Sequence, residues 1–119
     1  MNNQLFYAPA PPVPPTHDEI RDALEDARQL LGDGRVLAKG HAIDWVDGWP
    51  CWCIVGAITR MSRTTAIRDQ ALAVVRWTLP GRYSGRRIED WNDHPDTTLD
   101  KAKALLHQAK QFVGTVSAA

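Results

Sequence analysis

Apolar residues recur at intervals of three and four in separate stretches of this chain, and this spacing constrains the fold more than any other feature. Such a period places the apolar side chains on one face of an α-helix. The predicted helices span residues 16–31, 52–61, 65–79 and 97–113. At 119 residues the chain has the length of one domain. The pattern therefore predicts a mainly α, compact four-helix domain.

Residues typical of helix caps and helix ends flank several of the predicted helices. Thr16 is a capping residue, and Glu19 follows at the spacing of a capping box. Asp96 or Thr97 is the predicted cap of the last helix, with Gly114 at its end. Gly56 lies inside the second helix, where glycine is costly. The presence of Gly56 at this position therefore predicts that another backbone approaches the helix closely.

A small β-hairpin is predicted near residues 41–52. Asp47-Gly48 is typical of a two-residue hairpin turn, because glycine tolerates positive φ. Pro50 lacks an N–H, so the hairpin should be short and lie at an edge. The preceding residues 35–39 fit either a strand or a helical turn.

Residues 1–15 form a proline-rich arm without charged side chains, ahead of a helical domain at 16–114 and a tail at 115–119. Proline fixes φ and favours an extended conformation. The arm could pack on its own domain, stay disordered, or bind a partner.

The composition is that of an ordinary globular protein, with 44% hydrophobic residues, 24% charged residues and zero formal net charge. No apolar run is long enough for a membrane span, and the N-terminus does not resemble a signal peptide. Cys51 and Cys53 are too close in sequence for a good disulfide, which favours reduced thiols. We expect a cytoplasmic protein.

Residues 60–87 contain seven arginines, no lysine and one acid, Asp69. Arginine binds carboxylates and phosphates in a bidentate manner. Pairing with acidic residues elsewhere in the chain is the plainer interpretation. General nucleic-acid binding is not expected, because the chain lacks overall positive charge and a glycine-rich phosphate loop.

Tryptophan and arginine together suggest a binding surface. The predicted ligand- or partner-binding residues are Trp45, Trp49, Trp52, Arg82, Arg86 and Arg87. Aromatic and guanidinium groups suit a protein contact or a small anionic, nucleotide-like ligand. Trp77 and Trp91 are expected to enlarge the core instead.

An alternative is a hydrolase in which Cys53 is the nucleophile at a helix start, where the dipole would lower its pKa. His94 or His41 would be its base, and Asn92 would orient that base. The plainer interpretations are that Cys53 is a core residue and that Asn92-Asp93 closes a loop through bonds to the backbone.

A zinc site is a weaker hypothesis. Cys51, Cys53, His41 and His94 offer tetrahedral ligands, but Cys-x-Cys is not the usual zinc-knuckle spacing. We expect no metal and no cofactor.

The segments Cys53-Ile-Val-Gly56-Ala-Ile58 and Trp91-Asn-Asp93 resemble a family of small proteins from actinobacteria and their phages, for which no activity is established. Members share a Cys-x-x-Gly-Ala-Leu-like helix start and a downstream Trp-Asn-Asp. Ile58 replaces the usual leucine, and the likeness covers residues 20–113. It implies a mainly helical single domain.

These observations favour a non-enzymatic binding module, phage-related or regulatory, with the Cys53 hydrolase as the first alternative. A structural or assembly protein that uses the proline-rich arm is the second. A homo-oligomer is compatible with all of them.

Overall fold

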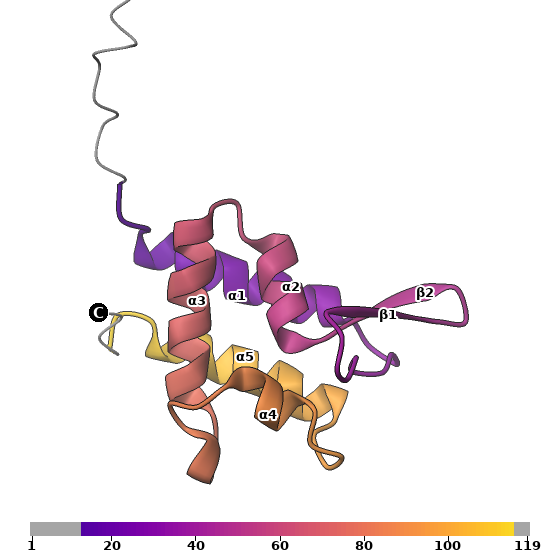
Figure 1. Ribbon diagram of the computed structural model, residues 1–119. Helices are drawn as coiled ribbons and strands as arrows, with labels where there is room; N and C mark the ends of the chain where they lie inside the picture. Colours follow the sequence, from indigo (N-terminus) through magenta and orange to yellow (C-terminus); the bar gives the residue numbers. More distant parts are fainter. Residues whose placement is uncertain (1–12, 116–119) are drawn as a thin grey trace, which may run out of the picture.

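The computed structural model describes residues 13–115. Within them the chain forms five α-helices, a short 3-10 helix and one two-stranded antiparallel sheet (Figure 1). The elements in chain order are α1 (His17–Leu31), β1 (Ile43–Val46), β2 (Trp49–Trp52), α2 (Ile54–Met61), α3 (Thr65–Thr78), η2 (Gly81–Tyr83), α4 (Ile88–Asn92) and α5 (Leu99–Phe112). The predicted mainly α fold with a hairpin is confirmed. The predicted arm lies almost wholly outside the described residues.

Helix α1 is the centre of the fold and packs against α5, α2 and α3. It starts with the predicted capping box, in which Thr16 and Glu19 each accept from the other's backbone N–H. The core that it shares with the other helices is aliphatic. Its fully buried large side chains include Leu24, Leu31, Ile54, Ile58, Leu106 and Val75.

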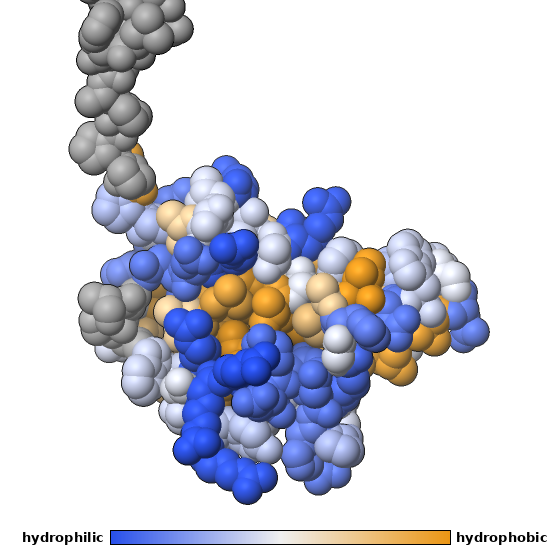
Figure 2. Space-filling model, in the orientation of Figure 1, coloured by the Kyte–Doolittle hydropathy of each residue, from blue (hydrophilic) through white to orange (hydrophobic). Residues whose placement is uncertain are grey.

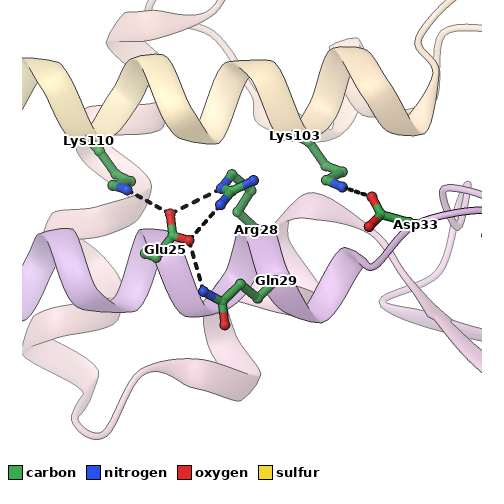
Figure 3. A network of polar contacts seen from close by, with 6 residues as sticks. All are labelled: Glu25, Arg28, Gln29, Asp33, Lys103 and Lys110. Atoms are coloured by element: carbon green, nitrogen blue, oxygen red, sulfur yellow. Dashed lines mark hydrogen bonds and ion pairs between the residues drawn. The ribbon is translucent and has the colours of Figure 1, made fainter.

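Ion pairs join α1 to α5 across the edge of this core (Figure 3). Glu25 accepts from Arg28 on its own helix at 2.6 Å and from Lys110 of α5 at 2.6 Å. Hydrogen bonds from Arg28, then Lys110 and Gln29, lower the pKa of Glu25 well below its ordinary value. Lys103 of α5 pairs with Asp33 just after α1.

The hairpin turn is the predicted one. Asp47 and Gly48 have φ values of 52° and 79°, as a type I′ turn requires. The strands pair Val46 with Trp49 and Trp45 with Pro50. The hairpin points away from the helices in Figure 1.

The ambiguous stretch 35–39 forms neither a strand nor a helix. It runs along the outer side of β2, where Ala38 N–H donates to Trp52 O at 3.1 Å. The Arg35 guanidinium donates to Pro50 O at 3.0 Å. This stretch therefore covers the edge of β2.

Two expectations at the C-terminal side were wrong. Residues 88–92 form the helix α4, which the prediction of four helices did not include. The last helix is capped by Thr98, not by Asp96 or Thr97. Thr97 is buried, and its hydroxyl donates to Trp91 O at 2.6 Å, so it is not available as a cap.

Gly56 behaves as predicted. A Cβ at this position would lie 2.9 Å from the carbonyl carbon of Ala42 and closer still to its oxygen. The backbones are this close because Cys53 N–H donates to Ala42 O at 3.0 Å. None of the helices in residues 13–115 has the length and apolar character needed to cross a bilayer.

Candidate functional site

The chain folds back on itself after α3. Gly85 N–H donates to Arg76 O at 2.8 Å, and Gly85 has a φ of 75°. The ring of Trp77 covers it, 3.1 Å from where a Cβ would lie. Only glycine fits this contact without strain. The turn returns residues 86–87 to the end of α3, next to Arg76.

A hollow of about 360 Å³ lies between α2, α3 and the start of α4. Its apolar lining comes from Val55, Leu72 and Ile88, and its charged lining comes from Arg76, Arg86, Arg87 and Glu89. We call this hollow the arginine groove. Figure 2 shows the hydrophobic surface in the middle of this face, bordered by strongly hydrophilic side chains.

Most arginines of residues 60–87 have no carboxylate partner. Arg68 pairs with its neighbour Asp69 at 3.0 Å, and Arg87 pairs with Glu89 at 3.5 Å. Five others form no ion pair within residues 13–115, namely Arg60, Arg63, Arg76, Arg82 and Arg86. Pairing with acidic residues elsewhere in the chain therefore does not account for this cluster.

A second hollow of about 310 Å³ continues the groove along α4. The two share Val55, Arg87 and Glu89 as lining residues. The rest of the second hollow is lined by Gly40, His41, Ala42, Cys53, Asn92 and Asp93. The result is one elongated depression with its cations at one end.

The side chain of Asn92 links α4 to the backbone of two other segments. Its Oδ1 accepts from Ile54 N–H at 2.9 Å, and its Nδ2 donates to Ala38 O at 2.8 Å. The side chain is buried, so these bonds satisfy backbone groups that water cannot reach. We call this arrangement the Asn92 clasp. It agrees with the interpretation that Asn92 closes a loop through bonds to the backbone.

Two neighbours extend the clasp. Asp93 accepts from Gly40 N–H at 2.9 Å. The Lys39 ammonium donates to His94 O at 2.6 Å and to Thr97 O at 2.7 Å. Burial lowers the pKa of Lys39, although Asp93 acts in the opposite direction. The Trp-Asn-Asp segment is thus tied to residues 38–40.

Cys53 is the N-cap of α2 and is only 8% exposed. Its sulfur accepts from Gly56 N–H at 3.2 Å. Burial raises the pKa of the thiol, which outweighs the opposite effect of the backbone N–H groups of Gly56 and Val55. The expected lowering was therefore wrong, because desolvation exceeds the contribution of the helix start.

His94 does not line the hollow that Cys53 lines. Its Nδ1 accepts from Asp96 N–H at 3.0 Å, and its ring meets the edge of Tyr83. The Asn92 amide is already used by Ile54 and Ala38. The structure brings Cys53, Asn92 and the alternative base His41 around one hollow, but it does not add His94.

The four residues of the zinc hypothesis are also separated. Cys51 lines a different hollow together with Trp49, whereas Cys53 lies beside His41. Residues 13–115 contain no group of three potential ligands positioned to hold a metal ion.

The predicted tryptophans lie on the hairpin. Trp45 is 65% exposed and Trp49 is 62% exposed, while Trp52 is half-buried against the core. The Arg35 guanidinium lies 5.1 Å from the centre of the Trp49 ring. None of these three tryptophans lines the arginine groove.

The predicted arginines lie elsewhere. Arg86 and Arg87 line the groove, and Arg82 stacks on Tyr83 at 5.3 Å. In Figure 1 the hairpin and the α3–α4 connection lie on different sides of the molecule. The predicted binding set therefore divides into two separate surfaces.

The two tryptophans assigned to the core differ. Trp91 is buried, as expected. Trp77 is 59% exposed, so its assignment to the core was wrong. Trp77 follows Arg76 on the outer side of α3. Its ring packs on Gly85 and does not enter the core.

The apolar lining residues Leu72 and Val55 were not predicted as part of the site, whereas Arg76 belongs to the arginine-rich stretch that suggested it. Leu72 and Arg76 are four residues apart and share one face of α3, which the sequence does show. Val55 comes from another helix, and nothing local in the sequence places it there.

No curated protein and no solved structure matches this chain. A family model does match residues 15–112, which is most of the chain and includes the clasp and the arginine groove. The protein therefore belongs to a family of unknown function (DUF6197).

Proposed function

We propose that the protein is a non-enzymatic binding module whose arginine groove takes an acidic segment of a protein partner. One observation carries this proposal. Arg76 and Arg86 border an apolar hollow and form no ion pair within residues 13–115. The formal net charge is zero, so this local excess of cations is not part of a generally basic chain.

The chemistry of the groove favours carboxylates beside an apolar side chain. A guanidinium offers a planar pair of donors that matches a carboxylate, and such charge-assisted bonds are stronger than neutral ones. Arg87 holds Glu89 at 3.5 Å, so a carboxylate already occupies one rim position. The floor of Val55, Leu72 and Ile88 would receive an apolar anchor.

The shape favours a peptide over a small ligand. The groove and the hollow beside it share lining residues and form one elongated depression. Small-molecule sites are usually concave and enclose most of their ligand. A nucleotide base would also need a stacking platform, and Trp45, Trp49 and Trp52 lie outside the groove.

The biological setting is part of the proposal. The resemblance to actinobacterial and phage proteins supports a phage-related or regulatory protein that occupies an acidic segment of a cellular partner. A role in assembly through residues 1–15 remains a hypothesis that lies almost wholly outside the described residues. The Cys53 hydrolase gains little support, since the thiol is buried with a raised pKa.

A labelled peptide with aspartates around one leucine is a suitable probe, measured by fluorescence anisotropy. We expect Arg76→Ala/Arg86→Ala to weaken its binding at least about tenfold, since each lost charge-assisted bond contributes about 1.5–3 kcal/mol. Arg60→Ala/Arg63→Ala removes the same charge outside the groove and should change little.

Equal loss in both double variants would show non-specific attraction and overturn the proposal. So would specific binding of ADP or inorganic phosphate in the absence of peptide binding, because it would identify a small-anion site instead.

A further inference from the structure

The hairpin tip, residues 44–49, is acidic and aromatic. Trp45 and Trp49 are both largely exposed. Asp44 and Asp47 form no ion pair within residues 13–115. Asp44 accepts only from the N–H of Trp45, at 2.9 Å. The tip therefore combines two open carboxylates with two exposed indoles.

Both faces of the hairpin tip carry an exposed indole, although the Arg35 side chain lies over the Trp49 ring. Residues paired across two strands lie on the same face, so Trp45 shares a face with Pro50, and Trp49 shares the other with Val46. The base of the hairpin is held by Trp52, which packs on the core, whereas Trp45 and Trp49 leave apolar surface open at the tip. This surface is available for a contact with another molecule.

The edges of the hairpin are less suited to contact than its side chains. On β1 the Asp44 carboxylate occupies the N–H of Trp45, which would otherwise be a free donor. On β2 the stretch 35–38 occupies the carbonyls of Pro50 and Trp52. Because edge groups are blocked on both strands, extension of the sheet by another strand is disfavoured. A contact made by the side chains of the tip is therefore favoured over pairing with another strand.

The arginine groove has the complementary chemistry. It combines an apolar floor with Arg76 and Arg86, which form no ion pair in the described part of the chain. An indole would pack on that floor and under a guanidinium, as Arg35 already lies over Trp49 at 5.1 Å. The carboxylates of the tip would meet the arginines on the rim.

We propose that the hairpin tip of one molecule docks in the arginine groove of a second copy of this chain. This inference rests on the proposed function, because it names the acidic segment that the groove takes. A molecule cannot fill its own groove, since its hairpin projects away from the helices that form it (Figure 1).

The contact joins two different surfaces, so it is heterologous. Each docking event leaves one hairpin and one groove free, and the assembly grows until a ring closes or a filament forms. A contact made by a hairpin tip alone is expected to be smaller than a standard interface of about 1,200–2,000 Å², so we expect weak association that depends on concentration. Salt weakens it, because charges on the rim are screened.

Two variants test the proposal. Trp45→Ala/Asp47→Asn disables the tip and keeps the turn, because asparagine tolerates positive φ. Arg76→Ala/Arg86→Ala disables the groove. All four side chains are exposed, and circular dichroism verifies the fold. Sedimentation velocity of the full chain, from low micromolar to near-millimolar concentration, is the readout.

The expected pattern is specific to a head-to-tail contact. The unmodified chain increases in mass with concentration, and each variant alone keeps the mass of one chain. An equimolar mixture of the two variants reaches the mass of two chains and stops there, because only one intact tip and one intact groove remain per pair. Asp26→Asn and Arg60→Ala/Arg63→Ala serve as controls that associate like the unmodified chain.

Other outcomes overturn the inference. A mixture that keeps the mass of one chain shows that tip and groove do not meet. Association of the tip variant alone shows a different contact. If the unmodified chain stays monomeric at all concentrations while the aspartate peptide binds through Arg76 and Arg86, the self-association is wrong and the proposed function stands. If Trp45→Ala/Asp47→Asn does not fold, Asp44→Asn/Asp47→Asn replaces it in the same mixture.

Discussion

The two ends of α4 use polar side chains in opposite ways. At its C-terminal end, Asn92 is buried and its amide bonds the backbone of Ile54 and Ala38. At its N-terminal end, Arg87 and Glu89 are exposed and border a groove with unpaired arginines. One end connects segments that are distant in sequence, and the other presents charge to the surroundings.

The difference shows why a motif and a binding site should be kept apart. Cys53, Gly56 and Asn92 belong to the most distinctive motifs, yet each has a structural role in capping, close packing or closing the clasp. The groove arginines belong to no motif. Stability should therefore depend on the first set and binding on the second.

Gly56→Ala should have the largest effect on stability. The added methyl would overlap the carbonyl of Ala42, and backbone on both sides limits relaxation. We expect a loss of about 3 kcal/mol or more in the free energy of unfolding. Urea unfolding measures it, with Thr59→Ala on the exposed side of the same helix as the control. A near-neutral result would mean that the hairpin base can move away from α2.

Asn92→Ala should be the next most severe. It leaves the buried N–H of Ile54 and the carbonyl of Ala38 without their partner. Each unsatisfied group costs about 1–3 kcal/mol, so we expect a loss of about 2–4 kcal/mol. Asp90→Ala, on the exposed side of α4, should be close to neutral in the same unfolding experiment. Equal losses in both variants would remove the distinction between the two ends of the helix.

Glu25→Gln removes the carboxylate from an ion-paired cluster, for comparison with the arginines of the groove that have no such pairing. We expect a loss of about 1 kcal/mol at neutral pH, because the partly exposed carboxylate accepts from Arg28 and Lys110. Its lowered pKa means that this stability is present above pH 4.5 and is lost as the pH falls toward the folded-state value.

The difference in melting temperature between Glu25→Gln and the unmodified chain should therefore shrink in acid. Asp26→Asn, next to it on α1, serves as a control without an ion pair. A difference that stays constant from pH 7 to strongly acidic solution would contradict the role assigned to the carboxylate.

Arg76→Ala/Arg86→Ala should have the smallest effect on stability, within about 0.5 kcal/mol, because exposed side chains without ion pairs contribute little. Thermal melting of this variant beside Arg60→Ala/Arg63→Ala provides the measurement. A loss comparable to that of Asn92→Ala would mean that the groove arginines hold the fold, and it would weaken the proposal that they bind a partner.

Most of the fold could be predicted from local patterns. Helix periodicity indicated α1, α2, α3 and α5, and the Asp47-Gly48 turn indicated the hairpin. α4 was missed because a five-residue helix is too short to show a period. Its existence depends on Ile88 and Trp91, which lie in the core only when the other helices are present.

The candidate site was predictable only in part. Arg86 and Arg87 were identified from the local excess of arginine, and they line the groove. Their separation from Trp45 and Trp49 was not predictable, because distance between surface patches depends on how the elements pack. The burial of Cys53 was likewise not predictable, since its position against the other helices depends on tertiary packing.

The amino-acid pattern alone determined where the helices and the hairpin turn lie, because capping, periodicity and positive φ are local properties. The interior glycine at position 56 also indicated the close approach of another backbone, which the structure identifies as that of Ala42. The tertiary structure decided which polar groups are satisfied and which stay open. Burial turned Cys53 and Asn92 into parts of the core. The return of the chain at Gly85 gathered the arginines into a groove in which Glu89 pairs with Arg87, whereas Arg76 and Arg86 form no ion pair within residues 13–115.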